Sequence, residues 1–241
     1  MNTTASSPIQ IASTQVPFGR LAIAMGIRFL PILAASATFL ALGINPYFLN
    51  VAIIGIDILT LVVLHFFMKA EGKRLRDLFL PFKAIDIAWG LLAFLIFVVT
   101  WWIASFISWL IVYQGQMPTA GYSQPSIPLW LGLISVVIMP ITIALAEEAL
   151  YRGYLQTRLS TRFGAVSGLL LSAIVFGIQH IGFRLPNIQA SAVQVLTTLI
   201  AGLVLGGLML WFKRTGPLVI AHWGLDFLFL GLPALFLAIA N

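Results

Sequence analysis

The feature of this sequence that most limits its fold is a succession of apolar runs, each long enough to cross a bilayer. A helix needs about twenty predominantly apolar residues to span the hydrocarbon core. Only 8% of the residues are charged and the mean hydropathy is +1.05, whereas about a quarter of the residues in soluble domains are charged. The sequence therefore predicts an all-α fold, a polytopic bundle of transmembrane helices.

Seven or eight spans are expected from the pattern of apolar runs. They cover about residues 21–44, 47–68, 87–113, 128–158, 164–181, 190–212 and 217 to the C-terminus. Gly231 and Pro233 are expected to divide the last run into two shorter helices. Residues 1–19 are polar and lack the apolar core of a signal peptide. We therefore expect residues 1–19 to form a flexible tail and residues 20–241 to form a single transmembrane domain.

Basic residues predict the orientation of the chain, because cytoplasmic loops carry an excess of Lys and Arg. The most charged segment, residues 69–86, also contains apolar side chains and predicts a short helix in the membrane interface. Residues 114–127 carry no charge and predict a loop on the opposite side. With the N-terminus in the cytoplasm, 10 of the 13 Lys and Arg residues lie on the cytoplasmic side. These are Arg20, Lys69, Lys73, Arg74, Arg76, Lys83, Arg158, Arg162, Lys213 and Arg214.

Composition excludes some kinds of site, and the motifs leave others without support. The sequence contains no cysteine, which rules out disulfides, thiolate metal ligands and a cysteine nucleophile within it. Membrane topology accounts for the net charge of +6, and no pattern of aromatic and basic residues predicts nucleic-acid binding. No Gly-x-Ser-x-Gly sequence supports a serine hydrolase, and no internal repeat indicates an inverted-repeat transporter.

Two adjacent carboxylates and an arginine near the end of the fourth run form the strongest candidate site. A charge inside a bilayer-length helix is costly, so a functional role is the default hypothesis. Glu148 and Arg152 are four residues apart and share a helix face, where they could also serve only as a buried ion pair that fixes packing. Glu147 points about 100° away and has no such partner in its own helix. Glu147 is therefore the candidate base.

Histidines in two later runs add ionisable groups to the same half of the chain. His222 and Asp226 are four residues apart and project from one face. In one chemistry, Glu147 and His180 activate a water for attack on an amide. His222 and residue 226 then stabilise the oxyanion. Alternatively, two histidines and a glutamate hold zinc, although the HExxH spacing is missing. A third interpretation is a transporter with a proton relay or a non-catalytic scaffold.

Three ionisable residues in the first two runs have no assigned role. Arg28 is close enough to the start of its run for the side chain to extend back to the interface. Asp57, near the middle of the second run, is expected to face other helices. His65 lies near the end of that run. Each is interpreted as an ordinary polar contact, so the first three runs contribute only helices.

Three motifs on three separate runs resemble those of the CAAX protease and bacteriocin-processing enzymes. This intramembrane family includes the Ras-converting CAAX proteases and many prokaryotic members. Its motifs are Glu-Glu-x-x-x-Arg, Phe-x-x-x-His, and His-x-x-x-Asn or Asp, in that order. Here they stand as Glu147-Glu148 with Arg152, Phe176 with His180, and His222 with Asp226. The resemblance covers about residues 128–230.

The resemblance implies a glutamic-type intramembrane endopeptidase with its catalytic core at residues 128–230 and no metal or other cofactor. Its partners would be a peptide or membrane-protein substrate and membrane lipid, and its location a prokaryotic plasma membrane. The implied roles are water activation by Glu147 and His180, support by Glu148, Arg152 and Phe176, and an oxyanion pocket formed by His222 and Asp226. The oligomeric state is not predicted.

One position departs from the best-known pattern. CAAX-cleaving members generally have Asn where this sequence has Asp226, and an ionised carboxylate cannot donate a hydrogen bond. Three consequences are open: Asp226 is protonated, it orients His222 instead, or activity is reduced.

Helix geometry raises a difficulty for a shared site. At 1.5 Å per residue, Glu147 lies roughly 16 Å, His222 roughly 8 Å and His180 roughly 24 Å from the predicted cytoplasmic helix ends. These side chains meet only if the helices tilt, if Pro140 kinks the fourth run, or if the fifth helix starts later than expected.

Overall fold

The computed structural model describes residues 15–116 and 126–240, and every regular element in these ranges is a helix. The α-helices are α1 (Phe18–Ala41), α2 (Leu49–Ala70), α3 (Ile85–Tyr113), α4 (Leu129–Val137), α5 (Met139–Glu147), α6 (Thr157–Phe163), α7 (Ala165–Ile178), α8 (Ile188–Phe212), α9 (Gly216–Asp226) and α10 (Leu232–Ile239). Three short 3-10 turns are η1 (Pro46–Phe48), η2 (Leu75–Leu78) and η4 (Gln179–Arg184). Two π-helical segments are η3 (Glu148–Gln156) and η5 (Phe227–Gly231). The predicted all-α fold is confirmed.

Seven stretches of the described chain are long and apolar enough to cross a membrane, in agreement with the seven or eight spans expected. They are Phe18–Ala41, Pro46–Ala70, Ile85–Tyr113, Leu129–Phe163, Ala165–Arg184, Ile188–Phe212 and Gly216–Ile239. The protein is therefore an integral, multi-pass membrane protein. The expected division near Gly231 takes the form of the π-helical segment η5, which joins α9 to α10 within one span. Most of the predicted tail and of the predicted loop at 114–127 lies outside the described residues.

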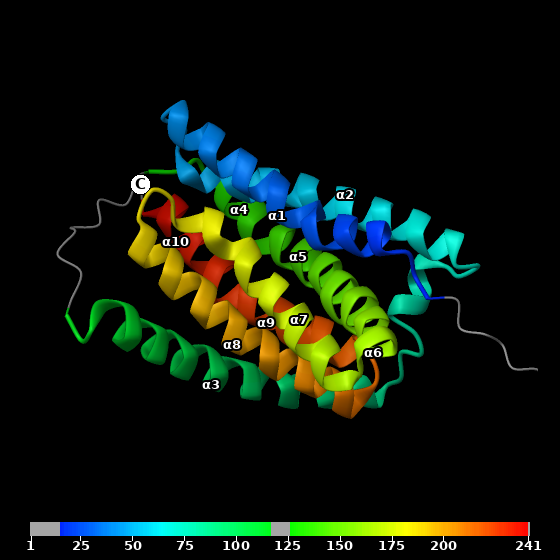
Figure 1. Ribbon diagram of the computed structural model, residues 1–241. Coiled ribbons are helices and arrows are strands. Elements are labelled where there is room, and N and C mark those ends of the chain that lie inside the picture. Colours follow the sequence, from blue (N-terminus) through cyan, green and yellow to red (C-terminus); the bar gives the residue numbers. More distant parts are fainter. Residues whose placement is uncertain (1–14, 117–125, 241) are drawn as a thin grey trace, which may run out of the picture.

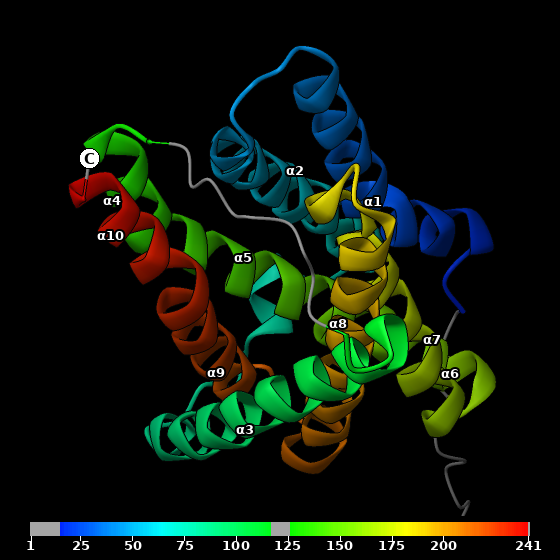
Figure 2. The ribbon, with the colours of Figure 1, turned by 90° about the vertical axis from the view of Figure 1, so that its left-hand side faces the viewer.

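The helices form a bundle with α1 and α2 along one side and α3 along the opposite side (Figure 1). Helix α3 packs against α8 and α9, while α2 packs against α5. Figure 2 shows α5 between α2 and α9. Glu147 is the last residue of α5 and His222 lies within α9. The packing therefore brings two of the predicted site residues onto neighbouring helices.

The span from Leu129 to Phe163 changes its helical geometry on both sides of α5. Helix α4 ends at Val137, and Pro140 takes the second position of α5, where its missing N–H is tolerated. The kink predicted at Pro140 thus corresponds to a break at Ile138. From Glu148 to Gln156 the chain continues as a π-helix, in which hydrogen bonds run from residue i to i+5. Such segments are rare and often mark functional sites.

Glycines allow α3 and α9 to approach closely. A Cβ on Gly90 would lie 2.7 Å from the Cβ of Ile220, and a Cβ on Gly224 would lie 2.8 Å from the ring of Phe94. A small residue at such a contact lets the backbone of one membrane helix approach the side chains of its neighbour closely. Ile220 and Gly224 flank His222 in the sequence, so this contact helps to fix the direction of the His222 side chain.

Most of the basic residues gather at one end of the bundle, called here the basic end. It consists of residues 69–86, Arg158, Arg162 and residues 213–214. Arg158 Nη2 lies 2.8 Å from Glu71 Oε2, and Arg214 Nη1 lies 2.7 Å from Asp86 Oδ1. These pairs join segments far apart in the sequence, which is the clustering that the distribution of basic residues predicts.

The short helix predicted within residues 69–86 is present only as a four-residue 3-10 helix. The segment between α2 and α3 contains a single 3-10 turn, η2. Leu78 is buried in a core cluster with Leu150 and Tyr154, and the Thr215 hydroxyl donates a 2.6 Å hydrogen bond to the Leu78 carbonyl oxygen. Leu78 thus packs into the protein, whereas Leu80 and Phe82 are 51% and 52% exposed.

Candidate active site

The acidic pair lies where α5 passes into the π-helical segment η3. Glu147 ends α5 and Glu148 begins η3, and their exposed fractions are 3% and 0%. A buried carboxylate is costly unless it is paired and hydrogen-bonded. The partners of these two side chains therefore define the site.

Glu148 links the first and third sequence motifs. Its Oε1 accepts a 3.0 Å hydrogen bond from Arg152 Nη1 and a 2.7 Å hydrogen bond from His222 Nδ1. The Arg152 guanidinium lies 4.2 Å from the ring centroid of Phe176, a cation–π contact that reaches the second motif. The expected pair of Glu148 and Arg152 is present, and it connects four of the predicted residues.

Glu147 pairs with a helix that the three motifs do not include. Its Oε1 accepts hydrogen bonds from Arg28 Nη2 at 2.7 Å and from Gln179 Nε2 at 3.0 Å. Arg28 also binds Asp57 through Nη1 and donates from Nε to Gln179 Oε1 at 3.0 Å. Tyr151 donates to the same Gln179 oxygen at 2.8 Å. One buried guanidinium therefore lies between two carboxylates.

The prediction that Arg28 extends to the membrane interface is wrong, because its side chain is fully buried against Glu147 and Asp57. The prediction that Asp57 faces other helices is confirmed. Charged residues within membrane spans usually pair with one another. The presence of one arginine and one aspartate in the first two spans was the signal for this network. Gln179 gave no comparable signal beyond its place beside His180.

His222 Nε2 faces two carboxylates without a direct hydrogen bond. It lies 3.6 Å from Glu147 Oε2 and 3.6 Å from Asp226 Oδ2. Both separations exceed the usual range for such a hydrogen bond, about 2.7–3.2 Å. Groups at this separation can be bridged by a water. Three predicted site residues from α5 and α9 thus converge on one buried point.

The difference in depth predicted between Glu147 and His222 does not keep these residues apart. Helix α9 begins at Gly216, directly after Thr215, and Thr215 is only 2% exposed. The first turn of α9 is therefore buried inside the protein. Counting residues from that helix end underestimates how deeply His222 lies.

His180 lies beside the cluster, and within the described residues no hydrogen bond or ion pair joins it to Glu147. Its Nδ1 donates a 2.8 Å hydrogen bond to the carbonyl oxygen of Phe176. In a neutral imidazole this leaves Nε2 unprotonated and able to accept a proton. The His180 ring packs between Phe176 and Phe183, at centroid distances of 5.1 and 5.4 Å. Its neighbour Gln179, rather than His180, contacts Glu147.

The carboxylates of the cluster are engaged by protein cations. Glu147 Oε1 binds Arg28, and Glu148 Oε1 binds Arg152. In the part of the chain that the structure describes, no group of three His, Asp or Glu side chains is arranged to hold a metal ion. A zinc site as proposed from the sequence would require these pairs to rearrange.

An apolar pocket of about 220 Å³ lies between α5 and α9. It is lined by Ile141, Ala144, Leu145, Val219, Ile220 and Trp223. Leu145 precedes Glu147 by two residues, and Trp223 follows His222 directly. Ligand pockets are commonly apolar with a few polar groups beside them. An apolar part of a ligand could occupy this pocket next to the polar cluster.

The site contains a carboxylate that can accept a proton and an imidazole that can donate a hydrogen bond to an oxyanion. Glu147 is anchored through Oε1, which leaves Oε2 facing the cluster, and an oriented carboxylate can accept a proton from water. His222 donates from Nδ1 to Glu148, so its protonated form would have a second N–H at Nε2 for a negatively charged oxygen. This combination suits hydrolysis of a carbonyl compound.

Comparison with known families supports this interpretation. Residues 127–228 match the family model described as Rce1-like, type II CAAX prenyl endopeptidase Rce1-like. The chain matches no curated protein and no solved structure. The match agrees with the resemblance predicted from the three motifs, and residues 127–228 are similar to that family. At the family level, the match supports a CAAX-type intramembrane protease. Arg28 and Asp57 lie outside the matched range.

Proposed function

We propose that this Rce1-like membrane protein is a glutamic-type endopeptidase that hydrolyses a peptide bond with water activated by Glu147 and His180. The observation that carries the proposal is the buried convergence of Glu147, His222 and Asp226, with His222 Nε2 3.6 Å from each carboxylate. All three residues lie in the segment that matches the family. The proposed catalytic core is residues 128–230 within a single transmembrane domain.

In the proposed reaction, Glu147 Oε2 takes a proton from the water while its oxygen attacks the carbonyl carbon of the substrate. His180 accepts a hydrogen bond from the same water through Nε2. The proton then passes from Glu147 to the departing amine nitrogen as the C–N bond breaks. Gln179 and Arg28 hold Glu147 Oε1, so the second oxygen of this carboxylate performs the transfer.

Protonated His222 stabilises the oxyanion of the tetrahedral intermediate through its Nε2–H. Glu148 positions His222 through Nδ1, and Arg152 positions Glu148. Because Glu148 occupies Nδ1, Asp226 lies near the other ring nitrogen and has little support as the residue that orients His222. We assign Asp226 a protonated carboxyl that donates to the same oxyanion.

Glu147→Gln tests the base. The protein is reconstituted in vesicles with a farnesylated peptide that ends in a CAAX sequence, and release of the C-terminal fragment is measured. We expect a loss of about a hundredfold to ten-thousandfold, because an amide cannot accept the proton. Glu71→Gln makes the same change at the basic end and should retain the wild-type rate. Wild-type turnover by Glu147→Gln would remove Glu147 from the mechanism.

The pairing of Glu147 with His180 has its own test. If both act on one water, the double variant Glu147→Gln/His180→Ala should be no slower than the slower single variant, because groups that act as a unit are not additive. Independent, multiplying losses would contradict a shared water. Stoichiometric zinc in the purified protein, with activity lost on chelation, would instead favour the metalloprotease alternative.

We further propose that the basic end faces the cytoplasm of a prokaryotic plasma membrane, with the N-terminus on the same side. The natural absence of cysteine permits a direct test. Ala84→Cys at the basic end should be protected from a membrane-impermeant maleimide in intact spheroplasts, and Gln116→Cys at the far end of α3 should be labelled. The reverse pattern would invert the proposed topology.

A further inference from the structure

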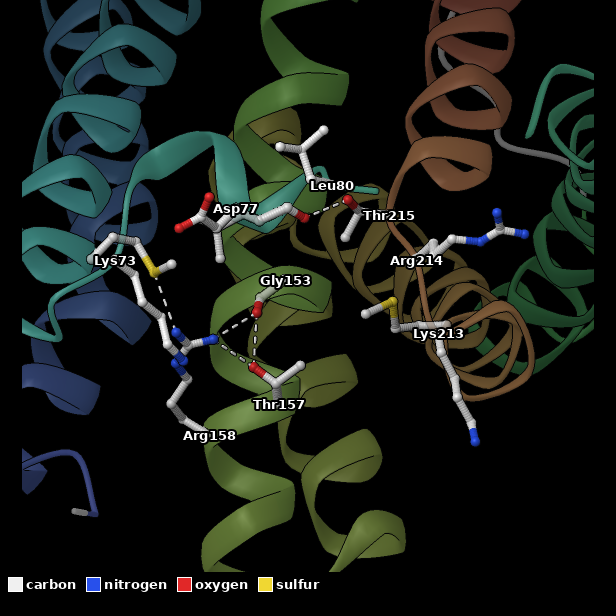
Figure 3. A pocket seen from close by; sticks show the side chains of 12 residues that line it. Lys73, Asp77, Leu80, Gly153, Thr157, Arg158, Lys213, Arg214 and Thr215 are labelled. Carbon is white, nitrogen blue, oxygen red and sulfur yellow. Dashed lines mark hydrogen bonds between the residues drawn. The ribbon is translucent and has the colours of Figure 1, made fainter. Parts of the chain in front are cut away.

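A second pocket, of about 460 Å³, lies at the basic end and is distinct from the acidic cluster (Figure 3). Four cationic side chains line it, together with the single carboxylate of Asp77. Lys73 and Arg158 lie on one side, and Lys213 and Arg214 lie on the other. The pocket therefore has an excess of positive charge from three separate parts of the chain.

Two of these cations are already occupied within the protein. Arg158 binds Glu71 at 2.8 Å and donates to the Gly153 carbonyl oxygen at 2.9 Å. Arg214 binds Asp86 at 2.7 Å and points away from the other labelled side chains in Figure 3. The side chains of Lys73 and Lys213, by contrast, form no hydrogen bond or ion pair within residues 15–116 and 126–240. These two lysines are the groups available to a ligand.

The pocket also has an apolar side at the level where spans end. Its lining includes Met68 near the end of α2 and Met209 near the end of α8. Leu80, on the connection to α3, lines it too and is 51% exposed. A site with cations and exposed apolar groups at the ends of membrane helices matches the boundary between lipid headgroups and acyl chains.

The start of α9 adds to the positive potential. Gly216 follows the pocket residue Thr215 and is the first residue of this 11-residue helix. A helix N-terminus carries a partial positive charge from its unpaired N–H groups. The Thr215 hydroxyl is committed to the Leu78 carbonyl oxygen and does not cap that end. The dipole of α9 therefore favours an anion on the same side as Lys213.

We propose that this pocket binds the phosphate-bearing headgroup of an anionic phospholipid, with Lys73 and Lys213 as its principal contacts. Basic pockets between transmembrane helices at this level bind such headgroups. The lipid glycerol and first methylene groups would lie against Leu80 and Met209. The proposal concerns binding alone and does not depend on peptide hydrolysis.

The test measures lipid binding to the purified protein in a neutral detergent at physiological salt. Phosphatidylglycerol, phosphatidylcholine and inorganic phosphate are titrated separately, and bound lipid is counted by native mass spectrometry. Lys73→Gln/Lys213→Gln should weaken phosphatidylglycerol binding about tenfold to thirtyfold. Lys69→Gln/Lys83→Gln removes equal charge from the same end outside the pocket lining and should change binding by less than about threefold, because salt screens distant charges.

Asp77→Asn separates lost affinity from lost folding. It removes the negative charge from the pocket lining and retains an oxygen for the Arg74 backbone N–H, which donates to Asp77 at 2.8 Å. We expect phosphatidylglycerol to bind about fivefold more tightly. A misfolded variant would not show tighter binding.

Four results would overturn the proposal. The control pair could weaken binding as much as the pocket pair, which would indicate a diffuse surface effect. Phosphatidylcholine could bind as tightly as phosphatidylglycerol, so that headgroup charge is irrelevant. Inorganic phosphate could bind as tightly as the lipid, which would indicate a site for a soluble anion. Asp77→Asn could leave affinity unchanged or lower it.

Discussion

The acidic cluster and the basic end use similar side chains in opposite ways. In the cluster, Arg28 and Arg152 are 0% and 1% exposed, and each is matched by a carboxylate. At the basic end, Lys73 and Lys213 are exposed and have no partner among the described residues. A cation enclosed by protein requires a counter-charge, whereas a cation at the interface stays solvated and available. Charge in a sequence therefore indicates a role only once its partners are known.

Arg28→Met is the strongest test of this difference between the acidic cluster and the basic end. It should lower the free energy of unfolding by about 3–5 kcal/mol, because Asp57 and Glu147 remain buried without their shared cation. Denaturant unfolding in detergent measures the change. Adding Asp57→Asn should recover part of the loss by removing one uncompensated charge. Unaltered unfolding of Arg28→Met would mean that the cluster tolerates unpaired charge as the basic end does.

Arg158→Met should have an intermediate effect. The Arg158 and Glu71 side chains are 13% and 15% exposed, so their ion pair is partly screened. We expect a loss of about 1 kcal/mol, measured by the same unfolding experiment. This loss should shrink at high salt, whereas the loss for Arg28→Met should persist. If Arg158→Met lost as much stability as Arg28→Met, and independently of salt, the partly exposed pair would behave like the buried one. That result would contradict the difference between the two regions.

The smallest effect is expected from Lys73→Gln/Lys213→Gln. Without anionic lipid, the unfolding midpoint should stay within about 2 °C of the wild type, because neither lysine has a partner to lose. Phosphatidylglycerol should raise the wild-type midpoint and have less effect on the variant, since a ligand stabilises only the state that it binds. A large drop in lipid-free detergent would indicate that these lysines serve the fold.

The sequence predicts the spans and the pair of Glu148 and Arg152 because both depend on local pattern. Apolar length identifies a span, and a separation of four residues identifies a shared helix face. The partners of Glu147 are different. Arg28 is 119 residues away and Gln179 is 32 residues away, so only tertiary packing brings them together. The opposite charges of Arg28 and Asp57 in the first two spans indicated that these residues pair, but not that Glu147 also binds Arg28.

Local sequence pattern also could not predict how deeply His222 lies or that residues 148–156 form a π-helix. The position of His222 depends on Thr215 being held inside the protein by Leu78. Nothing in residues 148–156 distinguishes a π-helix from an α-helix by propensity, because propensity is a weak prior that tertiary context overrides. Residues 69–86 have the composition of an interfacial helix, but packing of Leu78 in the core leaves only one short turn.

The pairing of Arg28 with Asp57 has a consequence for the order in which the protein is made. Arg28 on α1 and Asp57 on α2 are 29 residues apart, whereas Glu147 follows Arg28 by 119 residues. N-terminal parts of a chain emerge and begin to fold first. The growing hairpin of α1 and α2 can therefore neutralise its own arginine in the bilayer before α5 exists. Glu147 would then add a second carboxylate to an arginine that is already paired within the bilayer.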